Sequence, residues 1–293
     1  MARYVESLPY LERALAIREH IFGPMAAYVA FTLTHIARIA HYQGRYAEAQ
    51  SILTRVLDIR RQEYQPYYPD IANILSNLGM LRFDQGYIEE ARLLVEEALR
   101  VHQVVWGENH WHTARSHNHL GIVLHAAGDL VSGESEYGQA LAVRVQLLGE
   151  EHPDTANTRG HLARLRLDQD RVDQAMLLAE QALAAHLARL GQTHPYTARS
   201  LLVRGSCNRA LGQTISAQQD FMAALATYEQ VFGSRHPFVA RALHALSTVA
   251  TDQQSTLALL QRALTIYEQS LGKQHPETQI ARKSLSGEKT RRK

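Results

Sequence analysis

Apolar residues recur along the chain at the three- and four-residue spacing of amphipathic helices. Residues 74–99 show two such stripes: Ile74, Leu75, Leu78 and Leu81, then Ala91, Leu94, Val95, Ala98 and Leu99. A break at Gly86 separates the stripes, and glycine holds the matching place elsewhere: Gly44, Gly128 and Gly212. Because apolar residues at this spacing form one face of a helix, the pattern predicts pairs of helices joined by tight turns.

The predicted helix pairs repeat every 42 residues. The segment ALAIREHIFG at 14–23 returns with substitutions at 98–107, 140–149, 182–191 and 224–233, and after a shorter step of 39 residues at 263–272; residues 56–65 fill the remaining place. A period of this length is typical of solenoids, in which each unit packs only on its neighbours. We therefore predict an all-α fold, a right-handed α-solenoid of stacked antiparallel helix pairs.

Glycine and proline mark the boundaries of the repeats. Glycine accepts the positive φ found just past a helix end, and proline suits the first turn of the next helix. His-Pro dipeptides follow the glycines at 152–153, 194–195, 236–237 and 275–276. These marks predict one solenoid domain over 1–286: a half repeat at 4–23, repeats at about 25–65, 67–107, 110–149, 152–191 and 194–233, a shortened repeat at 236–272 and a terminal helix at 275–286, with a basic tail at 287–293. The shortened repeat lacks the glycine turn, so we expect an altered turn there.

Small residues occupy the places where the two helices of a pair should approach each other. On the first helix of each pair these are Ala37, Gly79, Gly121, Ala163 and Gly205. Together with the period and the Leu-Gly-x-x-His-Pro loop, they resemble the tetratricopeptide repeat, in the 42-residue form of kinesin light chain and its bacterial relatives. The resemblance runs from about Tyr4 to Leu285 and implies a concave groove, lined by first helices, that holds a peptide or partner protein. The heptad coiled coil of kinesin light chain has no counterpart here, so we do not expect attachment to the motor.

Composition narrows the possible functions. With 45% hydrophobic and 20% charged residues, the chain can bury a core. Six of the 31 basic residues lie within 282–293, and the remainder of the chain carries a small excess of acids, which argues against a nucleic-acid partner. The single cysteine, Cys207, favours a reducing compartment, and neither a membrane span nor a signal peptide is apparent. We therefore expect a cytoplasmic protein without a membrane partner.

The resemblance also implies which residues line the groove. The family places a peptide-binding Asn on the first helix of each repeat. We call the equivalent positions of successive repeats a column, and here this column reads His35, Asn77, His119, His161, Val203 and Ala245. One turn earlier the column is Phe31, Asn73, Arg115, Asn157, Arg199 and Arg241, and one turn later it includes Arg164. We predict a peptide-binding groove with an arginine bias, suited to a possibly acidic partner: His35, Asn73, Asn77, Arg115, His119, Asn157, His161, Arg164, Arg199 and Arg241. The alternative is that these residues are the solvated faces of a helical array.

The segment HWHTARSHNHL at 110–120 is the strongest candidate for a metal site. His110, however, belongs to the repeated loop, which indicates a structural role. His117 falls on the position of Leu75 and should face the core, whereas His119 should face the groove, so we predict no metal site. We find no P-loop, dinucleotide-binding motif or nucleophile elbow, and Cys207 lies in an apolar helix. The sequence therefore predicts a protein that is not an enzyme and needs no cofactor.

Two functional hypotheses follow from the sequence. The first is a protein-interaction scaffold that binds a peptide or a partner protein in the groove. The second is the sensor region of a larger signalling protein, such as a nucleotide-switched ATPase. For the tail GEKTRRK, binding to an acidic surface, a localisation signal and a solubilising end all stay open.

Overall fold

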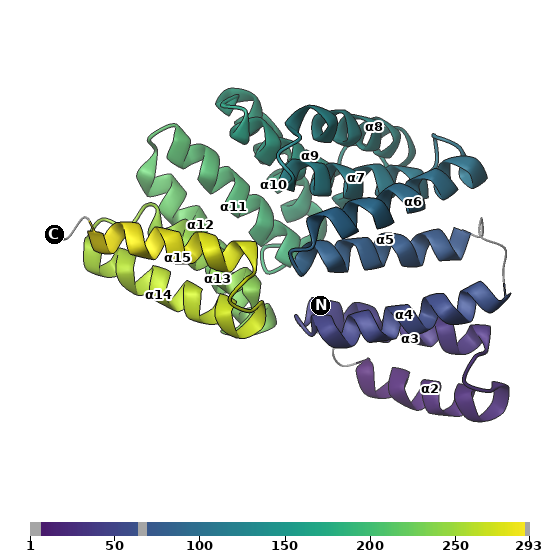
Figure 1. Ribbon diagram of the computed structural model, residues 1–293. Coiled ribbons are helices and arrows are strands. Elements are labelled where there is room, and N and C mark those ends of the chain that lie inside the picture. Colours follow the sequence, from purple (N-terminus) through teal and green to yellow (C-terminus); the bar gives the residue numbers. More distant parts are fainter. Residues whose placement is uncertain (1–6, 64–68, 291–293) are drawn as a thin grey trace. The chain divides into compact units, whose positions relative to one another are not determined.

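The computed structural model describes residues 7–63 and 69–290, and within them all regular structure is helical. Fourteen helices follow one another in the described residues (Figure 1): α2 (Leu8–Phe22), α3 (Ala27–Tyr42), α4 (Tyr46–Glu63), α5 (Pro69–Asp84), α6 (Ile88–Trp106), α7 (Trp111–Ala126), α8 (Leu130–Leu148), α9 (Pro153–Asp168), α10 (Val172–Leu190), α11 (Pro195–Ala210), α12 (Thr214–Phe232), α13 (Pro237–Ser247), α14 (Gln253–Ser270) and α15 (Pro276–Thr290). The predicted all-α fold is confirmed. Residues 4–6 of the predicted half repeat and 291–293 of the predicted tail lie outside the described residues.

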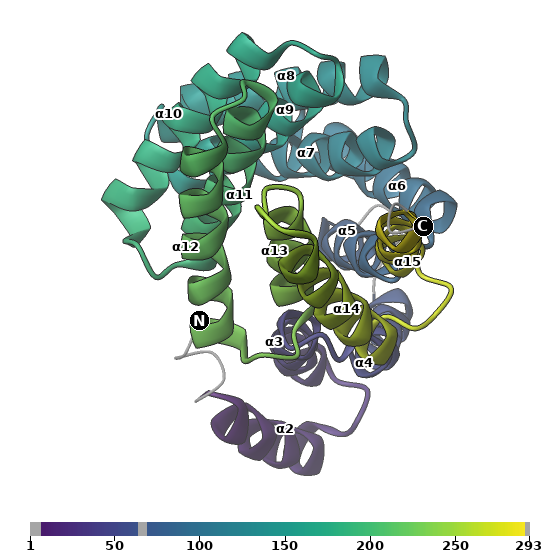
Figure 2. The same cartoon turned by 90° about the vertical axis from the view of Figure 1, so that its left-hand side faces the viewer.

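The chain forms two compact units, residues 1–143 and 144–293, with the boundary inside α8. Within each unit, helices that are consecutive in the sequence pack against each other in antiparallel pairs, as α3 and α4 do in the first unit and α13 and α14 in the second (Figure 2). We call the two helices of each repeat its first and second helix. In the second unit, for example, α9, α11 and α13 are first helices, and α10, α12 and α14 are second helices.

Glycine permits close contact between the two helices of a repeat. A Cβ atom added at Gly79 of α5 would lie 2.6 Å from Val95 of α6, and one added at Gly121 of α7 would lie 2.7 Å from the ring of Tyr137. Gly205 of α11 stands in the same relation to a phenylalanine of α12. Real side chains do not approach this closely, so these positions require glycine for packing rather than for backbone conformation. The predicted small-residue contact is confirmed at these three positions.

A histidine caps the start of most first helices. The backbone N–H of the second helical residue donates to Nδ1 of the capping histidine over 3.1–3.3 Å. The capping residues are His110, His152, His194, His236 and His275. In four of these helices proline follows the cap and has no N–H of its own, so the cap satisfies the next donor. The predicted structural role of His110 is confirmed.

A threonine ties the same loop to the preceding helix. Thr113 Oγ1 donates to the carbonyl oxygen of Gly107 at 2.7 Å, and the equivalent bond recurs in three further repeats, made by Thr155, Thr197 and Thr278 over 2.8–2.9 Å. These threonines are fully buried. The bond satisfies a carbonyl at the helix end that has no partner within the helix. Each loop is thereby held at both of its ends.

On six of the second helices, one side chain that is buried or partly buried reaches the first helix of the next repeat, and we call this contact the joint. In two joints it is an arginine: Arg144 Nη1 donates to Thr158 Oγ1 and to the carbonyl of Asp154, both at 2.7 Å, and Arg18 contacts Thr32 and the carbonyl of Tyr28 in the same way. In two other joints it is a histidine whose Nδ1 lies 2.8 Å from a serine hydroxyl: His102 with Ser116, and His186 with Ser200.

Two further joints contain a tyrosine in place of the arginine or histidine. These are Tyr228 and Tyr267, and both are buried. The residue that stands where the other joints have Thr or Ser is then alanine, at Ala242 and Ala281, and both alanines are fully buried. In these six joints arginine goes with threonine, histidine with serine and tyrosine with alanine. Such matching is expected when two side chains share one closed volume, because interiors are packed without spare space. The equivalent positions of α4 and α5 hold Arg60 and Ile74 instead, and Arg60 forms an ion pair with Asp70 at 3.5 Å.

The shortened repeat has a shorter first helix. α13 contains 11 residues, against 16 in α11, and the following turn leads to Asp252, which caps α14 by accepting from the N–H of Ser255 at 2.8 Å. The expected change in the turn is thus present. The last helix, α15, continues to Thr290, so the first four residues of the predicted basic tail are helical.

We predict that Gly121→Ala destabilises the first unit by about 1–3 kcal/mol, because the new methyl group would overlap the buried ring of Tyr137. Gly138→Ala on α8 is the matched control. Its Cβ would meet no atom within 4 Å, so this substitution should stabilise the helix by roughly 0.5–1 kcal/mol. Urea unfolding measures both effects. If the two variants shifted the midpoint in the same direction, close helix contact would not explain Gly121.

Candidate peptide-binding surface

The structure places all ten predicted groove residues on first helices. The first unit contains His35 on α3, Asn73 and Asn77 on α5, and Arg115 and His119 on α7. The second unit contains Asn157, His161 and Arg164 on α9, Arg199 on α11 and Arg241 on α13. Nine of the ten are at least partly exposed, and Asn157 is buried. The 42-residue period gives these residues the same place on successive helices, so side chains of neighbouring first helices can meet.

In the first unit, an arginine and an asparagine join α7 to α5. Arg115 Nη2 donates a hydrogen bond to Asn73 Oδ1, and its guanidinium lies 5.5 Å from the ring centroid of Trp111. About one helical turn further along, α7 and α5 are linked again, because His119 Nδ1 lies 2.8 Å from Ser76 Oγ. The aromatic ring and the amide together restrict the orientation of the guanidinium.

His35 lies apart from these pairs, near the beginning of the first unit. Its ring packs edge-on against Phe31 at 4.7 Å, and its Nδ1 lies 3.1 Å from Arg38 Nη2. Burial lowers the pKa of His35, and the charges of Arg38 and Arg18 lower it further. This imidazole is therefore neutral near pH 7, and it adds a hydrogen-bonding group but no charge to the surface.

In the second unit, the same pairing joins α11 to α9. Arg199 Nη2 donates to Asn157 Oδ1, and its guanidinium lies 5.0 Å from the ring centroid of Tyr196. Among the described residues, Arg199 has no carboxylate partner. This arginine therefore presents an uncompensated positive charge on the first-helix surface.

The other two predicted arginines of the second unit interact with acids of the chain. Arg241 forms an ion pair with Glu277 at 3.2 Å, and Arg164 lies 3.7 Å from Asp168. Burial alone would raise the pKa of Glu277, but the charges of Arg241 and Arg164 outweigh it and lower that pKa. An acidic ligand at Arg241 would compete with Glu277. Sequence reasoning missed this compensation, because Glu277 belongs to the terminal helix.

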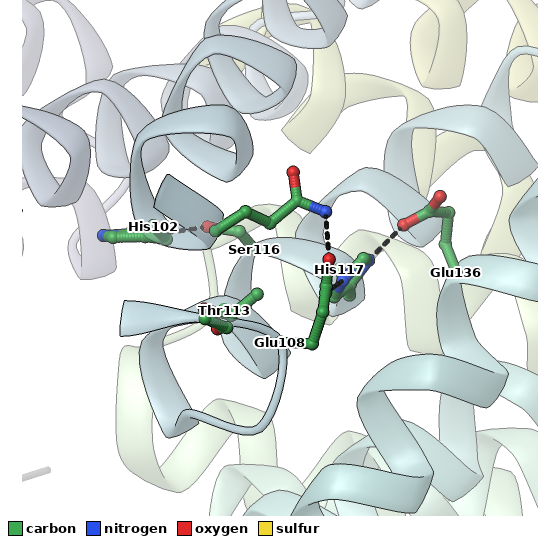
Figure 3. Close-up of polar contacts among 8 residues, drawn as sticks. His102, Glu108, Thr113, Ser116, His117 and Glu136 are labelled. Carbon is green, nitrogen blue, oxygen red and sulfur yellow. Dashed lines mark hydrogen bonds and ion pairs between the residues drawn. The ribbon is translucent and has the colours of Figure 1, made fainter. Parts of the chain in front are cut away.

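The histidine-rich segment of α7 forms separate contacts rather than one site. His117 is buried, with Nδ1 2.6 Å from Glu136 and Nε2 3.3 Å from Glu108 (Figure 3). Burial lowers the pKa of His117, but hydrogen bonds to Glu136 and Glu108 outweigh it, and the net shift is upward. The expected core position of His117 is thus confirmed. Among the described residues, no group of histidine, cysteine and acidic side chains is arranged to hold a metal ion.

The polar joints are the feature that sequence reasoning missed. Their signal is present in the chain: a histidine or arginine near the end of one repeat and, 14 positions later, a serine or threonine. Each pair combines a position of one repeat with a position of the next, so the face of a single helix does not show it. Comparing columns of neighbouring repeats would have revealed the pairs.

Two family models described as tetratricopeptide repeat match the chain. One matches residues 1–62, 28–103, 70–132, 112–188 and 196–256, and the other matches residues 239–277. The matches cover far more than half of the sequence. The chain belongs to the tetratricopeptide-repeat family. Domains of this family are generally protein–protein interaction modules and are typically non-catalytic, and the matching models include no enzyme family.

Solved structures similar to this tetratricopeptide-repeat protein include kinesin-light-chain-like proteins. BtubC (BKLC) from P. vanneervenii is 22% identical, with a TM-score of 0.58 over 78% of this chain and 92% of that chain. A putative kinesin light chain from Podosopora anserina with nearly identical TPR-like repeats is 22% identical, with a TM-score of 0.51 over 69% and 98%. The APC/C hetero-tetramer Cut9–Hcn1 is 13% identical, with a TM-score of 0.66 over 96% and 46%. These identities support the shared fold alone.

No match was found among curated proteins. In the described part of this tetratricopeptide-repeat protein, no helix is both long enough and apolar enough to cross a membrane.

We predict that acidification destabilises the repeat array through its histidine joints. Burial first, and then nearby arginines, lower the pKa of His102 to about 3 and that of His186 to about 4. An unfolded histidine titrates near pH 6.5, so the stability contributed by the neutral ring is present above pH 6.5 and is lost as the pH falls towards 4. Between pH 7 and pH 5 each joint should lose about 2 kcal/mol.

Urea unfolding at the two pH values measures this loss, and His186→Asn is the control. Asparagine cannot gain a proton, so the variant should lose less stability on acidification than the wild type, by about 2 kcal/mol. His117 contributes with the opposite sign: its stability is present below pH 6.5 and is lost as the pH rises through its raised pKa. An equal pH dependence in wild type and variant would contradict a neutral, buried His186.

Proposed function

We propose that this protein is an interaction scaffold that binds acidic peptide segments of a partner protein along the first helices of its repeats. The observation that carries the proposal is Arg199. Its guanidinium is oriented by Asn157 and Tyr196, and no carboxylate compensates its charge among the described residues. A guanidinium held in this way can offer two parallel N–H donors to a planar carboxylate. The buried Cys207 is consistent with a cytoplasmic location.

The experiment is a selection of random displayed peptides on the full chain, followed by calorimetry of the selected peptides. We expect the selected sequences to be enriched in Asp and Glu. Arg199→Ala should then weaken binding by roughly 10- to 100-fold, because a hydrogen bond to a charged group contributes about 1.5–3 kcal/mol.

The matched control is Arg189→Ala. Arg189 lies on the second helix α10, and its side chain is 58% exposed. The substitution removes the same charge from the unit as Arg199→Ala does, but at a place outside the proposed surface. We expect it to bind the selected peptides with nearly unchanged affinity. Selection of neutral or basic peptides, or equal losses in both variants, would refute the proposed function.

A further inference from the structure

Helix α2 is a second helix whose own first helix is missing from the described residues. Its Arg18 forms a joint with Thr32 of α3, as second helices of complete repeats do with the next first helix. No helix precedes α2 in the described part of the chain (Figure 1). The side of α2 that a first helix of the same repeat would cover contains Tyr10, Ala14 and Ile17, which follow one another at helical spacing. We call these three residues the open face.

The complete repeats show what covers this face elsewhere. In α6, the residues equivalent to Ala14 and Ile17 are Ala98 and Val101. Both belong to a core cluster built from α3, α4 and α5, to which no residue of α7 contributes among those described. The side of α6 that faces α7 uses other residues, Val95 and Leu99. The open face of α2 is therefore the side of a second helix that packs on its own first helix.

Exposure confirms that this face is uncovered only on α2. Ile17 is 49% exposed and Tyr10 is 77% exposed, and Ala14 is partly exposed. The residues equivalent to Ile17 on the six later second helices are each at most 8% exposed: Ile59, Val101, Val143, Ala185, Thr227 and Ile266. An exposed apolar surface that forms core in every other repeat indicates a site for another helix.

Helix α3 supplies a second apolar wall. Phe31 of α3 is 55% exposed, and its ring centroid lies 5.9 Å from the guanidinium of Arg18 on α2. In α5, α7, α9, α11 and α13 the same position holds asparagine or arginine. Arg115 and Arg199, at this position, each contact the equivalent residue of the preceding first helix. Phe31 therefore faces the place that a first helix before α2 would occupy.

A second copy of this chain does not offer a suitable helix in α15, which is itself a first helix. The side of α15 that would meet a second helix is exposed and polar, with Gln279, Lys283 and Ser286 in the places of Ala198, Leu202 and Gly205 of α11. In α11 the alanine and the leucine are buried, and the glycine lies against Phe221 of α12. Helix α15 thus lacks the apolar side with which first helices cover second helices.

We propose that the open face and Phe31 form a docking site for an amphipathic helix of a partner protein, which takes the place of the missing first helix. The repeats define the chemistry of this helix. It carries a small residue where it crosses α2, because a Cβ atom at Gly79 would lie 2.6 Å from Val95 of α6. Apolar residues flank the small residue, and a further apolar residue contacts Phe31.

The charges beside the site indicate acidic residues at the edges of the partner helix. Arg13 is exposed on α2, three positions after Tyr10 and four before Ile17. Arg38 is exposed on α3, two helical turns after Phe31. Such rim charges guide association more than they add affinity. This site is separate from the surface around Arg199, so it adds a second kind of partner to the proposed function.

Fluorescence anisotropy on the full chain tests the proposal. The probe is a fluorescein-labelled peptide of residues 69–84, the first helix that covers α6, with Asn73→Leu to match Phe31. We expect saturable binding to the wild type, weakened at least 10-fold by Ile17→Asp and by Tyr10→Asp, because each variant places a charge in an apolar contact. Leu93→Asp is the matched control, since Leu93 is 62% exposed on α6 outside the site. Leu93→Asp and Arg199→Ala should both leave binding unchanged.

Changes in the probe test the geometry of the contact. Gly79→Leu in the peptide should abolish binding, because the larger side chain prevents the close approach of the two helices. The peptide that keeps Asn73 should bind the wild type several-fold more weakly than the probe, and Phe31→Asn should remove this preference. No binding, equal losses in Ile17→Asp and Leu93→Asp, or equal binding of the Gly79→Leu peptide would overturn the proposal. A wild-type dimer in sedimentation that Ile17→Asp dissociates would also overturn it, because a second copy would then cover the open face.

Discussion

The joints of His102, Arg144 and His186 bury a polar side chain, and the alignment of neighbouring repeats depends on its hydrogen-bond partner in the next repeat. Arg144, His102 and His186 are buried, and leaving such a group without a hydrogen bond costs more than the bond itself contributes. The penalty applies only if the next helix is misplaced, because only the native position brings a serine or threonine within 2.7–2.8 Å. The joint thus opposes sliding between repeats more than it adds to stability.

The first-helix surface follows from this constraint. When α6 fixes α7 through His102 and Ser116, and α5 packs on α6, the inner faces of α5 and α7 come into a defined register. Asn73 and Arg115 then meet, although they are 42 positions apart in the sequence. The second unit repeats these contacts between helices, but the residues one helical turn further along its first helices are different. A protein-interaction surface of this kind requires little chemistry beyond accurate placement of a few polar groups on rigid helices.

The sequence predicted the fold well because its signals are local and repeated. The apolar spacing identified the helices, and the Gly and His-Pro marks identified their ends. Comparison with Leu75 also placed His117 in the core, but it could not show the carboxylates of Glu108 and Glu136 that make a buried histidine acceptable. Contacts between repeats, including the joints and the Arg241–Glu277 pair, depend on the packing of separate segments, which the spacing along one helix does not encode. Whether the ten groove residues bind a ligand stays a prediction.

The most direct test of the joint is a double-mutant cycle that converts the joint of His186 and Ser200 into the arginine–threonine type found at Arg144 and Thr158. Urea unfolding would compare wild type, His186→Arg, Ser200→Thr and the double variant. Each single change should destabilise the protein by about 1–3 kcal/mol, because it leaves a buried polar group poorly matched. The double variant should be more stable than the sum of the single effects predicts, by at least about 1 kcal/mol. Additive effects, within roughly 0.5 kcal/mol, would contradict the account, since they would mean that the two residues do not act as a matched pair.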